Sequence, residues 1–287
     1  IYNDISSKIF FSKKNFDILH TTYYDNVNFT NKPTIITVYD LIHEIYPNEF
    51  NFNSLPKQEV FKKIDHFICI SKNTQKDLIK YYGIEEKKTS VIYLSSFNKQ
   101  NSTIKKHLNI KPYFLYVGSR KRYKNFTLLV KAFCAIKDIS QNFDIICFGG
   151  GKFIKEEYEL FNKLGVNLNS IIQLNGNDES LLKLYKGATA YICTSKYEGF
   201  GLPILEAMSC GCPVISSNSS SLPEVYGDAA LPFMSDSLED LINCIEKITM
   251  NNSLKNELIN KGFKQSNQFS WKKCAKETSL VYKKLIL

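Results

Sequence analysis

Short apolar runs alternate with helical periodicity over the second half of the chain. The apolar runs have the length of strands and lie at 113–118, 144–149, 171–174, 190–194, 213–217 and 230–233. Helix-like segments lie between the first five of them, and in 125–138 the residues Phe126, Leu129 and Phe133 recur at helical spacing. Strands separated by helices pair in parallel through right-handed crossovers. The pattern therefore predicts a doubly wound parallel sheet.

The first hundred residues repeat this pattern less completely. Strand-like runs lie at 16–20, 34–40, 66–71 and 90–94. Ser71 is a typical helix N-cap and Gly83 a typical stop, so a helix is expected between them. Four strands make a second, thinner Rossmann-like half, and the polar stretch 97–111 has the composition of a linker.

The end of the chain predicts one more helix. Segment 271–287 is amphipathic, and its apolar residues are Trp271, Leu280, Val281 and Leu285. With 287 residues the chain also exceeds the usual size of one hydrophobic core. We therefore expect an α/β protein of two Rossmann-like doubly wound domains, over 1–105 and 106–270, followed by helix 271–287.

Composition excludes several classes of protein. The chain is 44% hydrophobic and 23% charged, its longest apolar runs are strand-sized, and no signal peptide or membrane span is visible. Eight cysteines lie mostly in apolar runs without a CxxC pair, which predicts buried thiols in a reducing cytosol and no metal site. The net charge of +9 suits a polyphosphate ligand, an anionic membrane or a biased composition. No nucleic-acid-binding motif accompanies it, so we expect no nucleic acid partner.

A glycine loop follows the strand that ends at Thr194. Gly199 and Gly201 allow a sharp turn and a close approach to a ligand, while Pro203 fits the first position of a helix. Gly211 fits the residue just past its end. A helix N-terminus presents unpaired N–H groups and a positive dipole end, which suit a pyrophosphate.

Two glutamates in this segment carry a family resemblance. Glu198 and Glu206 lie eight residues apart inside EGFGLPILEA, which resembles the acidic motif of family-4 retaining glycosyltransferases with the GT-B fold. The resemblance implies that Glu198 contacts the hydroxyls of the donor sugar and that Glu206 binds the ribose hydroxyls of the nucleotide. It places the donor against the intervening residues Gly199, Phe200, Gly201 and Leu202.

A second match lies at YVGSRKRYKNF, residues 116–126. The strand ends at Gly118, a basic loop follows, and Asn125 is placed to cap the next helix. The resemblance implies that Lys124 neutralises the donor diphosphate and assists its departure. Many relatives carry an arginine directly before this lysine, where the chain has Tyr123, and Arg120 or Arg122 is expected to substitute for it. Arg120 is the arginine that we assign to catalysis.

Three weaker matches complete the expected donor site. The resemblance implies a glycine turn at 148–151, including Gly150, and a nucleobase near 174–177, where Asn175 and Asn177 lie. His20 ends a strand, the place where α/β folds bind ligands, and in the family such a histidine reaches the donor sugar. A satisfied structural imidazole is the alternative. Relatives commonly have a second histidine where this chain has Tyr39.

The resemblance implies a retaining hexosyltransferase whose two domains face each other across a cleft. Its mannosyltransferase-like segments favour GDP-mannose, with UDP-sugars as the other donors, and the absence of a D-x-D motif favours metal independence. The implied acceptor is a glycan or lipid-linked hydroxyl, so we expect a cytoplasmic protein with peripheral contact at the inner membrane face. Helix 271–287 is expected to cross back to the N-terminal domain.

Two other functions stay open. The first is a nucleotide-sugar epimerase of the same fold, and the second is a catalytically incomplete nucleotide-sugar-binding module. The family's first strand and glycine-rich loop have no counterpart at the start of the chain, so the N-terminal half is expected to be incomplete and the chain a segment of a longer polypeptide. The sequence leaves the acceptor, the linkage and the oligomeric state open.

Overall fold

The computed structural model describes residues 15–22, 24, 30–49, 57–96, 111–120 and 122–287. Most of the expected linker at 97–111 lies outside these residues. The chain divides into two compact units. The first unit consists of Ile1–Leu94 with Ser270–Leu287, and the second unit of Ser95–Phe269.

The first unit is built on a parallel four-stranded sheet in the order β1-β2-β3-β4. Its strands are Leu19–Thr21, Thr34–Val38, His66–Cys69 and Thr89–Val91. Its helices are α2 (Ile42–Ile45), η1 (Pro47–Glu49), α3 (Lys57–Phe61), α4 (Lys72–Tyr82), η2 (Glu86–Lys88) and α13 (Trp271–Ile286). The four predicted strands are confirmed, each shortened or shifted at its ends.

Local sequence signals fix α4 as predicted. The Ser71 hydroxyl accepts a hydrogen bond from the Thr74 N–H at 3.0 Å, and Gly83 ends the helix in a left-handed conformation with φ of +65°. A glycine takes this conformation without the steric cost that a Cβ would bring. Helix α4 lies over one face of the sheet, where Leu78 packs with Phe67 and Phe61.

The last helix covers the other face of the same sheet. Val281 of α13 packs with Ile35, Ile68 and Ile92, and Leu285 adds a partly buried contact. Trp271 and Leu280 were expected on the apolar side, but their side chains are 50% and 56% exposed. The spacing of apolar residues in α13 allows more than one face of the helix to be buried. Packing against the sheet buries the face centred on Val281.

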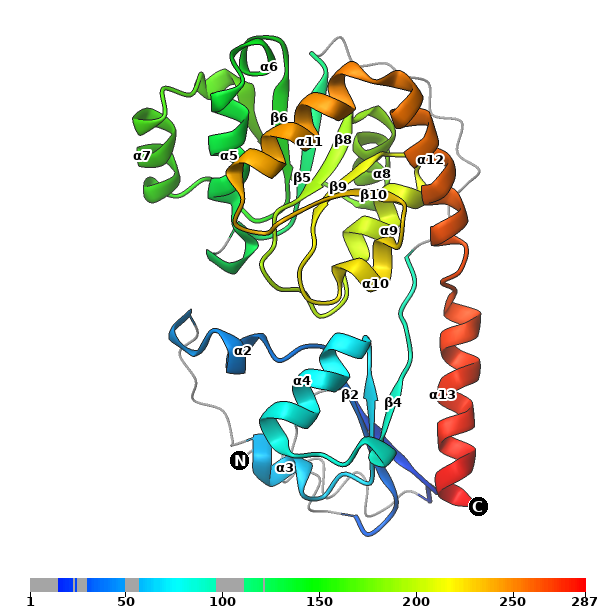
Figure 1. The fold of residues 1–287 in the computed structure, drawn as a ribbon. Helices are drawn as coiled ribbons and strands as arrows, with labels where there is room; N and C mark the ends of the chain where they lie inside the picture. Colours follow the sequence, from blue (N-terminus) through cyan, green and yellow to red (C-terminus); the bar gives the residue numbers. More distant parts are fainter. Residues whose placement is uncertain (1–14, 23, 25–29, 50–56, 97–110, 121) are drawn as a thin grey trace. The chain divides into compact units, whose positions relative to one another are not determined.

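The second unit is a parallel six-stranded sheet in the order β10-β9-β8-β5-β6-β7 (Figure 1). The strands are β5 (Tyr113–Val117), β6 (Asp144–Phe148), β7 (Ile171–Leu174), β8 (Ala190–Cys193), β9 (Val214–Ser217) and β10 (Ala230–Phe233). All six correspond to predicted strands. The predicted doubly wound α/β class is therefore confirmed.

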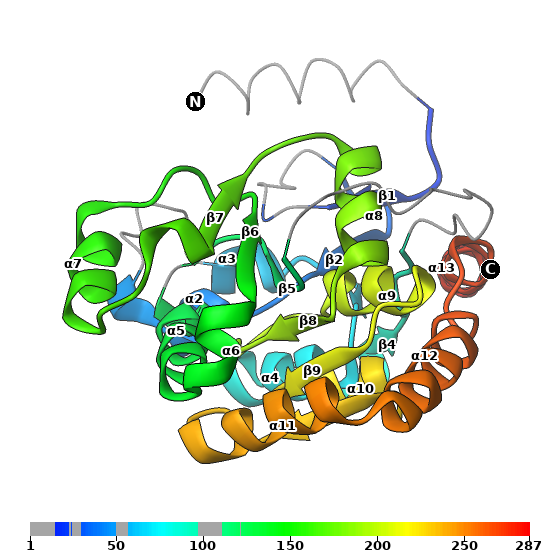
Figure 2. The ribbon, with the colours of Figure 1, turned by 90° about the horizontal axis from the view of Figure 1, so that it is seen from above.

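Helices cover both faces of this sheet. They are η3 (Arg122–Lys124), α5 (Phe126–Ala135), α6 (Lys137–Asn142), α7 (Lys155–Lys163), η4 (Leu168–Ser170), α8 (Asp178–Gly187), α9 (Leu202–Ser209), α10 (Leu222–Tyr226), α11 (Leu238–Met250) and α12 (Asn252–Ser266). Figure 2 shows α5 and α11 on one side of the strands and α8 and α9 on the other. The helix expected over 125–138 is divided, because Ile136 has an extended backbone between α5 and α6.

Most of the cysteine thiols are buried, as the sequence predicted. All eight cysteines are free, six are buried and two are partly buried. Burial raises the pKa of the Cys147 thiol to about 12, so it stays protonated at neutral pH.

Within the described residues no group of three His, Cys, Asp or Glu side chains has the arrangement of a metal site, and no helix is long and apolar enough to span a bilayer.

The packing of α13 gives a direct test of its buried face. Val281→Ala removes two buried methyl groups and should lower the free energy of unfolding by about 1.5–3 kcal/mol. The control Leu280→Ala, on the exposed side of the same helix, should change it by less than about 0.5 kcal/mol. Chemical denaturation of the full chain measures both, and equal effects would contradict the assigned face.

Candidate functional site

The direction of chain winding reverses between β5 and β8. The chain runs outwards from β5 through β6 to β7, then returns so that β8 pairs with the other side of β5. At such a switch point the loops after the two strands diverge and leave room for a ligand at the carboxyl ends. The loop after β5 carries Lys124, and the loop after β8 carries Glu198.

These two loops meet through an ion pair. The Lys124 Nζ lies 2.5 Å from the Glu198 Oε1, and the Ser195 hydroxyl donates to the same oxygen at 2.6 Å. The side chains of Lys124 and Glu198 are only 21% and 18% exposed. Burial lowers the pKa of Lys124, but the charge and hydrogen bond of Glu198 outweigh it and raise the pKa overall. The ammonium therefore stays charged at neutral pH.

Backbone contacts fix the loop that carries Lys124. The Thr194 hydroxyl donates to the Lys124 carbonyl, and the Lys196 N–H donates to the Tyr123 carbonyl, both at 2.8 Å. Asn125 was expected to cap α5 with its side chain, and this expectation is wrong. Its backbone is left-handed, with φ of +53°, and its amide donates instead to the Ser235 carbonyl at 3.1 Å.

Two serines that the sequence analysis missed hold the loop after β8. The Ser220 hydroxyl accepts from the Glu198 N–H at 2.8 Å. The Ser221 hydroxyl donates to the carbonyls of Glu198 and Phe200, at 2.8 and 3.0 Å. Their signal in the sequence is the serine-rich run that follows strand β9. These contacts satisfy the polar backbone of a loop that is largely buried.

The glycine loop enters α9 in the expected way, with one shift of position. Gly201 has φ of +113°, and a Cβ there would lie 2.9 Å from the Leu222 Cδ2, so the position requires glycine. Helix α9 begins at Leu202, which makes Pro203 its second residue rather than its first. The Phe200 ring is buried against Phe269, with the ring centroids 5.9 Å apart.

Glu206 lies one turn into α9 and has a partner of its own. The Tyr185 hydroxyl donates to its Oε2 at 3.0 Å. Burial raises the pKa of the Glu206 carboxyl, and the bond from Tyr185 offsets only part of this effect. Tyr185 itself is fully buried, so its hydroxyl has a fixed position below the carboxylate.

Arg120 is engaged on the other side of its loop. Its Nε lies 2.6 Å from the Glu157 Oε1 of α7, and its side chain is only 4% exposed. The guanidinium also donates to backbone carbonyls of the turn after β6. Arg122, by contrast, is an exposed residue two positions before Lys124.

Glycines shape the neighbouring loops. Gly118 follows β5 with φ of +105°, and Gly150 has φ of +71°. A Cβ on Gly150 would lie 2.5 Å from the Gly118 carbonyl oxygen. Asn175 is exposed and accepts from the Gln173 amide at 3.0 Å. Asn177 caps α8, because its Oδ1 accepts from the Ser180 N–H at 3.0 Å. The Asn177 side chain is therefore used for a helix start.

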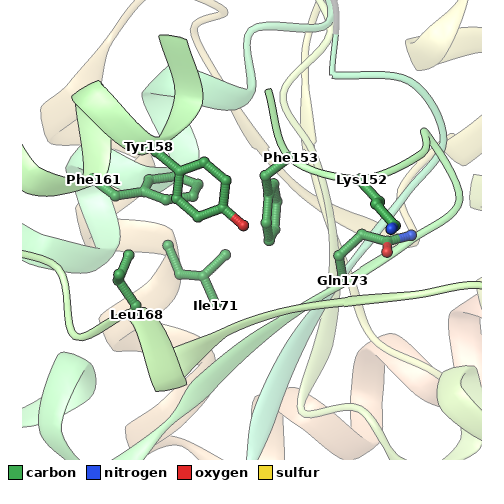
Figure 3. Close-up of a pocket in the computed structure, with 7 residues that line it drawn as sticks. All are labelled: Lys152, Phe153, Tyr158, Phe161, Leu168, Ile171 and Gln173. Carbon is green, nitrogen blue, oxygen red and sulfur yellow. The ribbon is translucent and has the colours of Figure 1, made fainter. Parts of the chain in front are cut away.

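A pocket of about 440 Å³ lies beside the turn that follows β6, between α7 and β7. Figure 3 shows its aromatic wall, with Lys152 and Gln173 at one end and Leu168 at the other. The lining residues are Lys152, Phe153, Tyr158, Phe161, Leu168, Ile171 and Gln173. None of the predicted site residues lines it, so the pocket is separate from the Lys124–Glu198 pair.

His20 has partners on both ring nitrogens within the first unit. Its Nδ1 lies 2.6 Å from the Tyr282 hydroxyl of α13, and its Nε2 lies 2.8 Å from the Thr37 hydroxyl of β2. Burial lowers the pKa of His20, so the ring is neutral at neutral pH. These contacts match the structural alternative for His20, and they tie α13 to the sheet.

Comparison with known proteins defines the family. Residues 97–265 match the family model of glycosyl transferases group 1, and residues 6–94 match that of glycosyltransferase family 4. The first match covers more than half of the chain, and the chain therefore belongs to the group 1 glycosyl transferases. Its strands and helices give it the GT-B fold of this family.

Relatives and a solved structure agree with this assignment. The chain is 35% identical over 175 residues to O-antigen chain mannosyltransferase B of Escherichia coli, covering 60% of this chain and 46% of the relative. It is 32% identical over 200 residues to O-antigen chain mannosyltransferase RfbU of Salmonella typhimurium, covering 68% and 55%. The chain thus spans about half the length of these relatives. The structure of sucrose-phosphate synthase from Thermosynechococcus elongatus aligns with a TM-score of 0.82 at 20% identity, over 98% of this chain and 76% of that one.

The His20 contacts predict a measurable contribution to stability. Tyr282→Phe removes one partner of a partly buried imidazole and should lower the free energy of unfolding by about 1–3 kcal/mol. The control Tyr158→Phe removes a hydroxyl from an exposed tyrosine and should leave it nearly unchanged. Denaturant titrations of both variants decide the question. If Tyr282→Phe has the same free energy of unfolding as the wild type, the structural role of His20 is contradicted.

Proposed function

We propose that the chain transfers a hexosyl group from a nucleoside-diphosphate sugar to a hydroxyl of a glycan or lipid-linked acceptor, with retention at the anomeric carbon. The observation that carries the proposal is the Lys124–Glu198 pair at the switch point of the second unit. It joins a fixed cation and a fixed carboxylate at the mouth of a glycine loop that leads into α9. A diphosphate and a sugar require these two kinds of group side by side.

Lys124 supplies the charge that the leaving group needs. The diphosphate gains negative charge as the glycosidic bond breaks, and a preorganised ammonium stabilises that state more than the ground state. Arg122 is the arginine we assign to the same task, because Arg120 is bound to Glu157. The N-terminus of α9 adds the positive end of its helix dipole.

Glu198 has two tasks in this proposal. Without donor it neutralises Lys124, which keeps a partly buried ammonium paired. When the diphosphate occupies Lys124, the carboxylate is released to accept hydrogen bonds from the sugar hydroxyls. The Ser195 hydroxyl donates to the Oε1 and orients the carboxylate. Glu206, one turn along α9, is the group we assign to the ribose hydroxyls.

The names of the relatives support a particular donor. Both O-antigen relatives are called mannosyltransferases, which favours mannose carried by GDP. We propose metal-independent binding, because Lys124, Arg122 and the start of α9 provide the positive charge that the diphosphate needs. The net charge of +9 suits a lipid-linked acceptor at an anionic membrane face, so we extend the proposal to peripheral contact on the cytoplasmic side.

A binding and turnover screen tests this function. GDP-mannose, other GDP-sugars and UDP-sugars are compared by calorimetry, with and without EDTA, and transfer is then assayed with lipid-linked acceptors. We expect GDP-mannose to bind in EDTA and to be consumed only when acceptor is present. Consumption without acceptor would instead indicate the epimerase, and binding without transfer to any acceptor an incomplete module.

Glu206 predicts a pH dependence of nucleotide binding. Its carboxylate form accepts the ribose hydroxyls, and burial raises its pKa above the ordinary value of 4.5. Affinity for free GDP should therefore fall as the pH is lowered, beginning above the pH at which an ordinary glutamate is protonated. Glu206→Gln should bind about tenfold more weakly at neutral pH. Calorimetry across pH measures both effects.

The variant also serves as the control for the nucleotide itself. The diphosphate titrates in the same range, and it does so equally with the Glu206→Gln chain. The difference between the two pH profiles therefore isolates Glu206. Identical profiles for wild type and variant would reject the ribose role.

Lys124→Ala should damage chemistry more than folding. Loss of the ammonium beside the leaving group should lower kcat on the order of 10²–10³-fold, as for other preorganised charges. The control Lys196→Ala lies on the neighbouring loop and breaks a pair with exposed Asp236. It should keep kcat. Steady-state kinetics and melting temperatures are measured together, and near-normal kcat in the Lys124 variant would disprove the placement of the diphosphate.

A further inference from the structure

Arg120 and Glu157 form a nearly buried ion pair between the loop after β5 and helix α7 of the second unit. The Arg120 Nε lies 2.6 Å from the Glu157 Oε1, and the Nη2 lies 3.3 Å from the Oε2. The two side chains are 4% and 14% exposed. A guanidinium and a carboxylate that meet through two N–H groups have a fixed relative orientation. The pair therefore holds the loop after β5 to the first turn of α7.

The same guanidinium binds the backbone of the turn after β6. Its Nη1 donates to the Gly149 carbonyl at 3.3 Å, and its Nη2 donates to the carbonyls of Gly151 and Lys152 at 3.0 and 3.1 Å. The Arg120 Cζ lies 4.7 Å from the centroid of the Phe153 ring. All three nitrogens of Arg120 thus have protein partners, which is the reason it is not assigned to the diphosphate.

The turn needs such an anchor, because three glycines in a row form it. Gly149, Gly150 and Gly151 have φ values of +79°, +71° and +77°. Glycines lose more conformational freedom on ordering than other residues, so a run of them is held only by external contacts. A Cβ on Gly150 would lie 2.5 Å from the Gly118 carbonyl oxygen and 2.8 Å from the Arg120 Nη1. The two loops are therefore in direct contact at this point.

Because the peptide group is planar, the carbonyls that Arg120 binds also fix the direction of the N–H groups that follow them. In a trans peptide the C=O and the following N–H point in opposite directions, and no cis peptide bond occurs among the residues that the structure describes. Carbonyls that point at Arg120 therefore direct the N–H groups of Gly150 and Lys152 away from it. Among the residues the structure describes, no acceptor is bonded to either N–H. Both residues are exposed at the carboxyl end of β6, beside the loop that carries Lys124.

The loop after β5 is thus fixed at both ends. Arg120 ties its start to the glycine turn, while the bonds from Thr194 and Lys196 tie Lys124 and Tyr123 to the loop after β8. Movement of either end would shift the cations relative to the turn. The ion pair with Glu157 is the contact that orients Arg120 for its three carbonyl bonds.

We propose that Arg120 and Glu157 are positioning residues, which hold the glycine turn 149–151 so that the N–H groups of Gly150 and Lys152 bind the nucleotide part of the donor. This inference rests on the proposed function, because the nucleotide is the ligand it invokes. The pair touches no reacting atom. Its loss should weaken nucleotide binding and leave the chemistry of bound donor largely intact.

The test compares Glu157→Gln and Arg120→Lys with the wild-type chain. Lysine keeps the charge of Arg120 but lacks the planar fork that reaches the carbonyls. In each variant we expect the Kd of free GDP and the KM of GDP-mannose to rise on the order of tenfold, with kcat changed less than about threefold. Glu159→Gln is the matched control, since Glu159 lies on the same helix in an exposed pair with Lys155. It should leave Kd and KM unchanged.

Hydrogen exchange gives a readout that needs no ligand. Faster exchange confined to peptides spanning 148–154 in Glu157→Gln, with the rest of the second unit unchanged, is expected if the pair holds the turn. A purely structural pair would lower the melting temperature and the active fraction without changing Kd, and that result would overturn the proposal. If the wild type binds no nucleotide at all, the proposed function fails first; wild-type affinity in both variants overturns the positioning role alone.

Discussion

The ion pair between Lys124 and Glu198 depends on the order of the strands around it. Because β8 returns to pair with β5, two loops separated by 74 positions begin side by side and bring an ammonium and a carboxylate within 2.5 Å. Partial burial makes each charge costly alone, so the pair holds the two loops together.

The loops around that pair follow one physical requirement, which is that buried backbone groups need partners. Ser221 serves two carbonyls of the loop after β8, and Arg120 serves three of the turn after β6. The glycine loop before α9 is buried, whereas Gly150 and Gly151 of the turn after β6 are exposed. Gly150 and Gly151 therefore present backbone to solvent, while the loop before α9 is held inside the second unit.

Sequence reasoning placed these loops but not the partners of their side chains. Lys124 and Glu198 contact each other, whereas Arg120 is paired with Glu157 and His20 is bonded to Tyr282. The reason is that a motif fixes distance along the chain, while a long or two-sided side chain chooses among neighbours brought in by other elements. Glu157 and Tyr282 come from helices whose packing no local pattern encodes.

The sequence by itself determined the alternation of strands and helices, the limits of α4, and the sharp backbone turn at Gly201. These features depend on local physics: side-chain period, a hydroxyl that caps a helix, and a backbone conformation that a Cβ forbids. Only the tertiary structure decided which face of α13 is buried, that the Asn125 side chain does not cap α5, and which arginine remains exposed beside Lys124. Those outcomes depend on contacts between residues far apart in the chain, where burial and hydrogen bonding select one of several locally equivalent arrangements.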